Sequence, residues 1–239
     1  MSKICIYLFF NFRVRVYNIY MQAKIKTFLL GIGAGAAIGV GSFLFTLCSR
    51  FSLKELGSAL FAIGLFTVCF FGLFLYTGKI GYFIDSKNKN SYALDLLVGY
   101  IGNIVGAVLL GYLLRFIFTL FNSETLVTIN KITASRMIDL GNGGSPFIKQ
   151  LGTSFFCGVL VYLAVHFWKK PWNFLLRTII LVLCVFLFVY LGFEHCIANM
   201  FYFSYGNAWN LQSLVNILVV TIGNTLGALF TRSIVLINK

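Results

Sequence analysis

The sequence has little charge, and acidic residues are the scarcest. Only 10% of the 239 residues are charged, and six of them are Asp or Glu. A soluble domain carries about a quarter charged residues, so this composition excludes a soluble enzyme and a DNA-binding domain, and no nucleic-acid partner is expected. The six cysteines form no CxxC pair and no metal-type spacing. A disulfide scaffold is therefore excluded, and neither a metal nor a cofactor is expected, since phosphate- and dinucleotide-binding motifs are also missing.

Long apolar runs are what the sequence has instead. Hydrophobic residues make up 59% of the chain, and several windows exceed the roughly 18 residues that cross a bilayer core. The final run, 195–231, is too long for one helix and contains the turn-rich patch 204–208. We therefore predict an all-α integral membrane protein with six crossings, at 27–48, 56–78, 96–114, 150–168, 178–193 and from about residue 211.

The distribution of basic residues predicts the orientation. Six crossings place both termini on one side, and basic residues concentrate on the cytoplasmic side of a membrane protein. About twelve basic residues lie on the side of the termini and five on the other, with Lys79 and Arg115 too close to the spans to count. We expect a multi-pass protein of the plasma (inner) membrane with both termini cytoplasmic. The five on the opposite side are Arg50, Lys54, Lys131, Arg136 and Lys149.

Two segments lie outside the predicted crossings. Residues 1–26 are interpreted as a cytoplasmic or interfacial lead-in, because their charge follows the apolar patch and no small-residue cleavage site is present. The polar stretch 122–145 is predicted to be a short exported connection. Residues 27–239 then form a single channel domain.

An internal repeat divides this domain. The pattern G-N-x-x-G-A occurs at 102–107 and again at 223–228, and each asparagine follows an interruption in an apolar span about 28 to 30 residues earlier, at 75–78 and 192–195. Matched interruptions in two three-helix halves are typical of inverted repeats with broken helices near the bilayer midplane. We predict halves at about 27–121 and 146–236, with the second and fifth helices broken.

Glu194 and His195 are the only adjacent ionisable pair predicted at membrane depth. An ionisable group there is costly, so a functional role is the default interpretation. The alternatives are that Glu194 caps a half-helix and that His195 only packs. Thr77 presents a hydroxyl opposite His195 by symmetry, or it bonds its own backbone. Asn103 and Asn224 are interpreted as braces for the broken segments rather than as transport groups.

These motifs resemble the formate/nitrite transporter family over residues 26–236. The strongest is GFEHCIANMF at 192–201, which is similar to the family's G-F-E-H-x-I-A-N-M-F signature. The supporting motifs are LYTG at 75–78, YIGNIVGA at 100–107, CGVLVYLAV at 157–165 and VTIGN at 220–224.

The resemblance implies an aquaporin-like protomer in a homopentamer, with one pore in each protomer. The family's central histidine falls on His195, its loop threonine on Thr77 and its loop leucine on Leu75. Its apolar constrictions fall on Phe61, Leu65 and Phe188, with Tyr76 in place of a phenylalanine, and its remaining structural positions fall on Gly78, Glu194 and Asn224.

The sequence departs from the family at three places. An ungapped count puts Pro146 where the family has a lysine before the fourth helix, and Lys149 is the nearest replacement. Tyr162 stands where an asparagine is common, and the family's amphipathic N-terminal helix is not evident.

The leading hypothesis is a channel for small monovalent anions of weak acids, formate or nitrite, which pass as the neutral acid or with a proton. Hydrosulfide is the alternative substrate. A membrane-embedded enzyme that uses Glu194 and His195 is a hypothesis of a different class, and a structural scaffold is a third. The enzyme lacks a nucleophile, and the scaffold leaves the ionisable residues at the symmetric interruptions unexplained.

Overall fold

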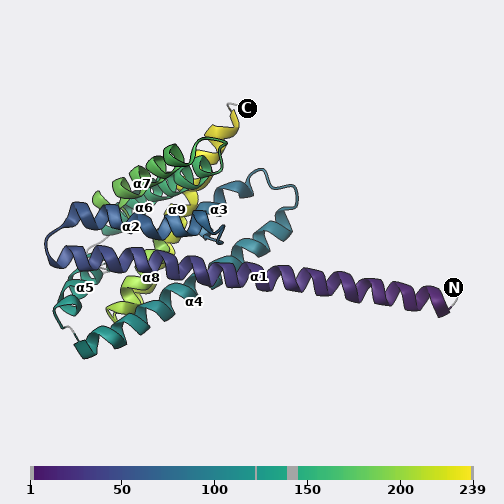
Figure 1. Ribbon diagram of the computed structural model, residues 1–239, viewed down its shortest axis with the longest axis horizontal. Coiled ribbons are helices and arrows are strands. Elements are labelled where there is room, and N and C mark those ends of the chain that lie inside the picture. The colour runs from purple at the N-terminus through teal and green to yellow at the C-terminus, as the bar shows by residue number, and fades with distance from the viewer. Residues whose placement is uncertain (1–2, 122, 139–144, 238–239) are drawn as a thin grey trace.

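The computed structural model describes residues 3–121, 123–138 and 145–237, and in these ranges the chain is helical without strands. Long helices lie side by side, and the N-terminal part of the first projects beyond the others (Figure 1). The elements are α1 (Lys3–Arg50), α2 (Lys54–Phe70), α3 (Tyr76–Lys79), the 3₁₀ helix η1 (Ile80–Phe83), α4 (Lys89–Phe121), α5 (Ser123–Arg136), α6 (Ser145–Trp168), α7 (Phe174–Tyr190), α8 (Cys196–Tyr205) and α9 (Leu211–Ile237).

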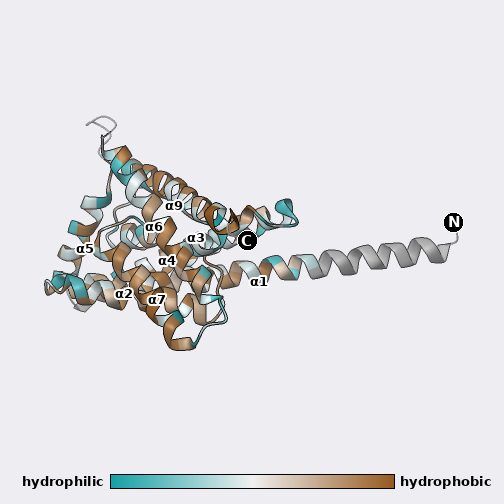
Figure 2. Cartoon of the chain, turned by 90° about the horizontal axis from the view of Figure 1, so that it is seen from above, coloured by the Kyte–Doolittle hydropathy of each residue, from teal (hydrophilic) through white to brown (hydrophobic). Residues whose placement is uncertain are grey.

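Four of these helices are long and apolar enough to cross a membrane: Tyr20–Arg50, Lys89–Thr119, Pro146–Trp168 and Leu211–Ile237. The helix α7 is also apolar but shorter, with 17 residues. Figure 2 shows the apolar character along the bundled helices and polar residues towards their ends. The helix α9 exposes Leu214, Leu218, Ile222 and Leu226 at one-turn spacing, which gives it an apolar outer stripe of the kind that faces lipid or another membrane helix.

The chain leaves helical geometry at two equivalent places. The helix α2 ends at Phe70 and α3 begins at Tyr76, while α7 ends at Tyr190 and α8 begins at Cys196. In each interval a glycine adopts a left-handed conformation, Gly72 with φ 64° and Gly192 with φ 73°. Glycine reaches this region without the steric cost of a Cβ atom, so both helices are interrupted at corresponding positions of the two sequence halves.

The two halves also pack alike. The helix α1 lies along α4, and α6 lies along α9. The second glycine of each G-N-x-x-G-A pattern makes this close approach possible. A Cβ atom at Gly106 would strike the backbone of α1 at Ile32, and one at Gly227 would strike that of α6 at Phe155. Small residues at these crossings let the helix backbones approach each other closely.

Two segments differ from the sequence expectation. The first helix begins at Lys3 and continues through the predicted lead-in, although the side chains before Tyr20, including Cys5, lie outside the described residues. The predicted connection 122–145 contains the helix α5, whose Thr125, Ile129 and Thr133 are buried at one-turn spacing. Hydropathy misses such a helix because two of these three core residues are threonines. Residues 122 and 139–144 of the connection lie outside the described ranges.

Candidate functional site

Asn103 supports the backbone where α2 and α3 separate. Its side-chain Oδ1 accepts a hydrogen bond from the Tyr76 N–H at 2.9 Å, and its Nδ2 donates to the Phe74 carbonyl at 2.7 Å and to the Gly31 carbonyl at 2.9 Å. The side chain is completely buried. A helix end in an apolar environment has backbone groups without partners inside the helix, and this one amide satisfies groups on both sides of the break.

Asn224 makes the same set of bonds in the other half. Its Oδ1 accepts from the Cys196 N–H at 3.0 Å, and its Nδ2 donates to the Glu194 carbonyl at 2.9 Å and to the Ser154 carbonyl at 2.8 Å. The equivalent bonding of Asn103 and Asn224 follows the sequence repeat. In each case all three hydrogen bonds of the side chain go to backbone groups.

His195 and Thr77 meet between the two breaks although they are 118 positions apart in sequence. Thr77 Oγ1 lies 2.9 Å from His195 Nε2, and both side chains are buried. His195 is also the N-cap of α8, where its Nδ1 accepts from the Ala198 N–H at 3.3 Å. An accepting Nδ1 carries no proton, so we assign the neutral tautomer with the proton on Nε2. Thr77 then accepts from His195 and keeps its own hydroxyl proton for another acceptor.

Apolar side chains surround this polar pair. The rings of Phe61 and Phe188 meet edge to face with centroids 5.6 Å apart, and the Phe188 centroid lies 6.0 Å from that of His195. Phe61, Phe188, Leu65 and Leu75 are all buried. The hydroxyl group of the histidine–threonine pair therefore sits in a predominantly apolar interior.

Two residues of α3, Tyr76 and Gly78, contact neighbouring helices rather than the histidine. The Tyr76 hydroxyl lies 2.9 Å from Thr225 Oγ1, and its ring centroid lies 4.7 Å from that of Tyr100, so this side chain is turned towards α9 and α4. Gly78 packs against α6, because a Cβ atom there would come within 2.7 Å of Val165 Cγ2. The missing side chain at Gly78 lets α3 lie close to α6.

A cavity of about 380 Å³ opens beside Glu194 on the side opposite the chain termini, with Lys149 and Gln150 in its lining. Arg136, at the end of α5, donates from Nη1 to Glu194 Oε2 at 2.7 Å and to Asn199 Oδ1 at 2.8 Å. Asn199 in turn donates to Glu194 Oε2 at 2.6 Å. A buried carboxylate needs such a partner. Lys149 is exposed in the cavity and, among the described residues, forms no salt bridge.

Two further amides fix Arg136 through its backbone. Its carbonyl oxygen accepts from Gln150 Nε2 and from Asn216 Nδ2, both at 2.7 Å. Asn216 also donates to Gln150 Oε1 at 2.8 Å and accepts from Asn199 at 2.9 Å. Helices α5, α6, α8 and α9 are thus joined by one polar network around the carboxylate of Glu194.

The comparison with known sequences is decisive here. The sequence model of the family described as Formate/nitrite transporter matches residues 16–237. The chain belongs to this family. The "Formate-nitrite transporter" of Entamoeba histolytica is 26% identical over 227 residues, and the match covers 87% of this chain and 62% of that protein. "Formate channel FocA" of Escherichia coli K12 is 28% identical over 200 residues, with 77% and 68% covered.

Solved structures agree with this assignment. The structure titled "Pentameric formate channel with formate bound" superposes with a TM-score of 0.74 over 91% of this chain and 99% of that chain, at 23% sequence identity. This likeness shows a shared fold. As a formate/nitrite transporter family member, the chain is an integral membrane transport protein and not an enzyme, which removes the hypothesis of acid–base catalysis by Glu194 and His195.

Sequence reasoning missed the partner of Glu194 in this family member. It counted Arg136 only as one of five basic residues on the side opposite the termini, and it named Lys149 as the vestibule cation. One signal was available, because a glutamate at membrane depth requires a compensating cation. The sequence did not predict that this cation comes from α5, because hydropathy gives no sign that α5 packs against α8.

Proposed function

We propose that the chain is a channel for small monovalent anions of weak acids, with formate as the leading substrate, and that it works as a homopentamer with one pore in each protomer. The six crossings are α1, the pair α2 and α3, α4, α6, the pair α7 and α8, and α9. Both termini face the cytoplasm. Support comes from the names of the relatives and of the pentameric formate channel, and from the excess of basic residues on the side of the termini.

The observation that carries the proposal is the hydrogen bond between Thr77 and His195 within an apolar interior. Phe61, Phe188, Leu65 and Leu75 form the constrictions around it, and Tyr76 backs the loop that holds Leu75. An anion that meets such a ring must lose its water, which costs many kcal/mol without compensation. A neutral weak acid loses far less hydration energy and passes.

The Thr77 hydroxyl then serves as the donor to the substrate oxygen. Because Thr77 accepts from His195, its own proton points to a third partner, and a carboxylate or nitrite oxygen is a suitable acceptor. The substrate gains its proton in the vestibule, where water is present. Lys149 and the half-helix ends attract the anion to this region.

Flux into proteoliposomes tests the proposal. Formate, nitrite and hydrosulfide are compared from pH 5 to pH 8 against protein-free liposomes. We expect formate flux that increases towards acid pH, because the neutral acid becomes more abundant. A larger flux of hydrosulfide than of formate would identify the alternative substrate, and no flux above the control for all three anions would refute the channel proposal. Thr77→Val removes the hydroxyl and Thr77→Ser, the matched control, keeps it, so the formate flux of these two variants tests whether the hydroxyl is needed for transport.

A further inference from the structure

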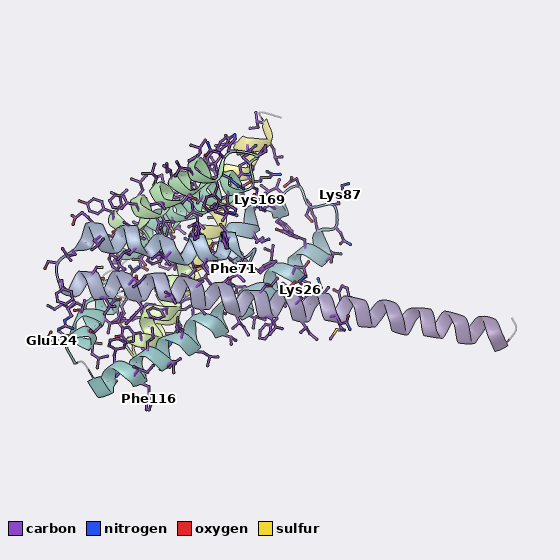
Figure 3. All side chains as sticks on the ribbon, in the orientation of Figure 1. Lys26, Phe71, Lys87, Phe116, Glu124 and Lys169 are labelled. Atoms are coloured by element: carbon purple, nitrogen blue, oxygen red, sulfur yellow. The ribbon has the colours of Figure 1, made fainter. Side chains whose placement is uncertain are left out.

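A second cavity lies outside Leu75 on the side of the chain termini. Its volume is about 220 Å³, and its walls come from the end of α2, the break before α3, α3 itself and the end of α6. Apolar residues such as Leu73 and Val165 form most of the lining, but two lysines join them: Lys79, the last residue of α3, and Lys169, which follows α6. Figure 3 shows Lys169 towards the same end of the molecule as Lys87, away from Glu124.

The two ammonium groups rest on aromatic rings. Lys79 Nζ lies 5.3 Å from the centroid of the Phe74 ring, and Lys169 Nζ lies 3.8 Å from that of Tyr82. Within the part of the chain that the structure describes, neither lysine forms a salt bridge, and the lining of the cavity holds no carboxylate. Ring faces attract cations but leave their net charge uncompensated.

Nearby charges do not neutralise the pair. Arg232 lies over the same Tyr82 ring at 5.0 Å and is itself paired with Asp85, which is therefore engaged. The cavity at the opposite end differs, because Glu194 compensates Arg136 there. Two lysines thus line a small, mostly apolar cavity at the termini end, and an entering anion would supply the opposite charge.

We propose that Lys79 and Lys169 form a capture site for a small monovalent anion, which they hold next to Leu75 before it enters the constriction. This inference rests on the proposed channel function and adds a binding site at the end of the pore opposite Arg136. The apolar walls favour weakly hydrated monovalent anions, since a multiply charged ion would have to give up more water to enter.

The charge of Lys169 is sensitive to pH near neutrality. Loss of solvent, followed by repulsion from Lys79, lowers the pKa of Lys169 to about 8. The groups that face it are Lys79 from α3, Cys69 from α2, Tyr82 from η1 and Arg232 from α9. Lys169 is charged below this pH and loses its proton above it, so the site holds its full charge only in neutral and acid solution.

Cys69 provides a direct reading of the charge in this cavity because it belongs to the same lining. The full-length protein is treated with two methanethiosulfonate reagents of similar size, one carrying a sulfonate and one carrying a trimethylammonium group. Peptide mass spectrometry measures the rate of labelling at Cys69 itself, at constant ionic strength. The double variant Lys79→Gln/Lys169→Gln removes the charges, and Lys170→Gln, which removes a neighbouring charge outside the lining, is the matched control.

We expect the anionic reagent to be favoured in the wild type. The ratio of anionic to cationic labelling should fall by roughly tenfold for each lysine removed, and formate should slow labelling in the wild type but not in the double variant. An unchanged ratio, an equal decrease in Lys170→Gln, or no labelling of Cys69 by either reagent would overturn the inference. The labelling of Cys69 is measured without transport. If the labelling ratio depends on the two lysines but the protein shows no anion flux, the proposed channel function is refuted and the proposed anion site is retained.

Discussion

Replacing Arg136 by methionine is expected to lower the free energy of unfolding by about 3–5 kcal/mol, the cost of leaving a buried carboxylate without its cation. The side chains of Arg136 and Glu194 are only 13% and 10% exposed, so water does little to compensate the lost pair. Asn199 still donates to Glu194 in this variant, but one neutral amide does not balance a full charge.

A double-mutant cycle separates the pair from the packing of either side chain. Glu194→Gln alone is expected to cost about 1.5–3 kcal/mol, the range for hydrogen bonds to charged groups. The double variant Arg136→Met/Glu194→Gln should be more stable than Arg136→Met, because the second change removes the unpaired charge. This order requires the coupling free energy of the two groups to exceed the cost of Glu194→Gln, so a value of about 3 kcal/mol, the upper end for contacting groups, is expected.

The assay is equilibrium unfolding in mixed micelles with increasing SDS, followed by tryptophan fluorescence. Lys149→Met is the matched control, since this exposed lysine lines the same cavity without an ion pair in the described structure, and it should change stability by less than about 0.5 kcal/mol. A double variant as unstable as the sum of the two single variants would show that the two charges do not stabilise each other and would refute the reasoning.

Three further predictions concern the centre and the termini end of the pore. Asn103→Ala and Asn224→Ala should each destabilise the protein by about 2 kcal/mol or more in the same unfolding assay, because each leaves one N–H and one C=O group at its helix break without a partner. A loss below about 1 kcal/mol for either variant would contradict the role of a brace. Thr77→Val should reduce formate flux by roughly tenfold, which corresponds to the free energy of one hydrogen bond. Thr77→Ser keeps the hydroxyl and should keep the flux. Equal flux in both variants would exclude a function for the hydroxyl. In the wild type, the apparent affinity for formate added on the termini side should weaken as the pH rises through about 8, where Lys169 loses its charge. The variant Lys169→Gln should show no such decrease in affinity near this pH. A decrease that persists in the variant would assign the titration to another group.

The membrane helices could be predicted because their signal is local. A run of apolar residues is sufficient to identify a helix in lipid, and the helix expected from about Leu211 begins at that residue. The polar patch before it contains Asn207, which adopts a positive φ of 51° in the turn between α8 and α9. Asparagine tolerates this conformation better than most residues, so the composition of the patch already indicated a turn.

The contacts between distant segments could not be read in the same way. Lys79 was set aside because it lies too close to a span to indicate orientation, and Lys169 was counted as one basic residue among several. Only the packing of α3 against α6 after the break at Gly72 brings Lys79 to the end of α6, where Lys79 and Lys169 line one cavity. Arg136 is a similar case, since a polar helix with a threonine-rich buried face has no hydropathy signal. Which charged residues lie close together depends on how distant helices pack, and this packing could not be predicted from a single sequence.

The N-cap formed by His195 constrains how protons cross this protein. A histidine that relays protons accepts at one ring nitrogen and releases at the other, but here Nδ1 is held by the Ala198 N–H and Nε2 by Thr77. Protonation of Nδ1 would break the hydrogen bond by which His195 caps the first turn of α8. In the channel proposed above, the proton then travels on the substrate itself, one for each anion. Transport through such a channel would be electrically silent, and a voltage across the membrane would neither drive nor oppose it, so the direction of flow would follow the gradients of the acid alone.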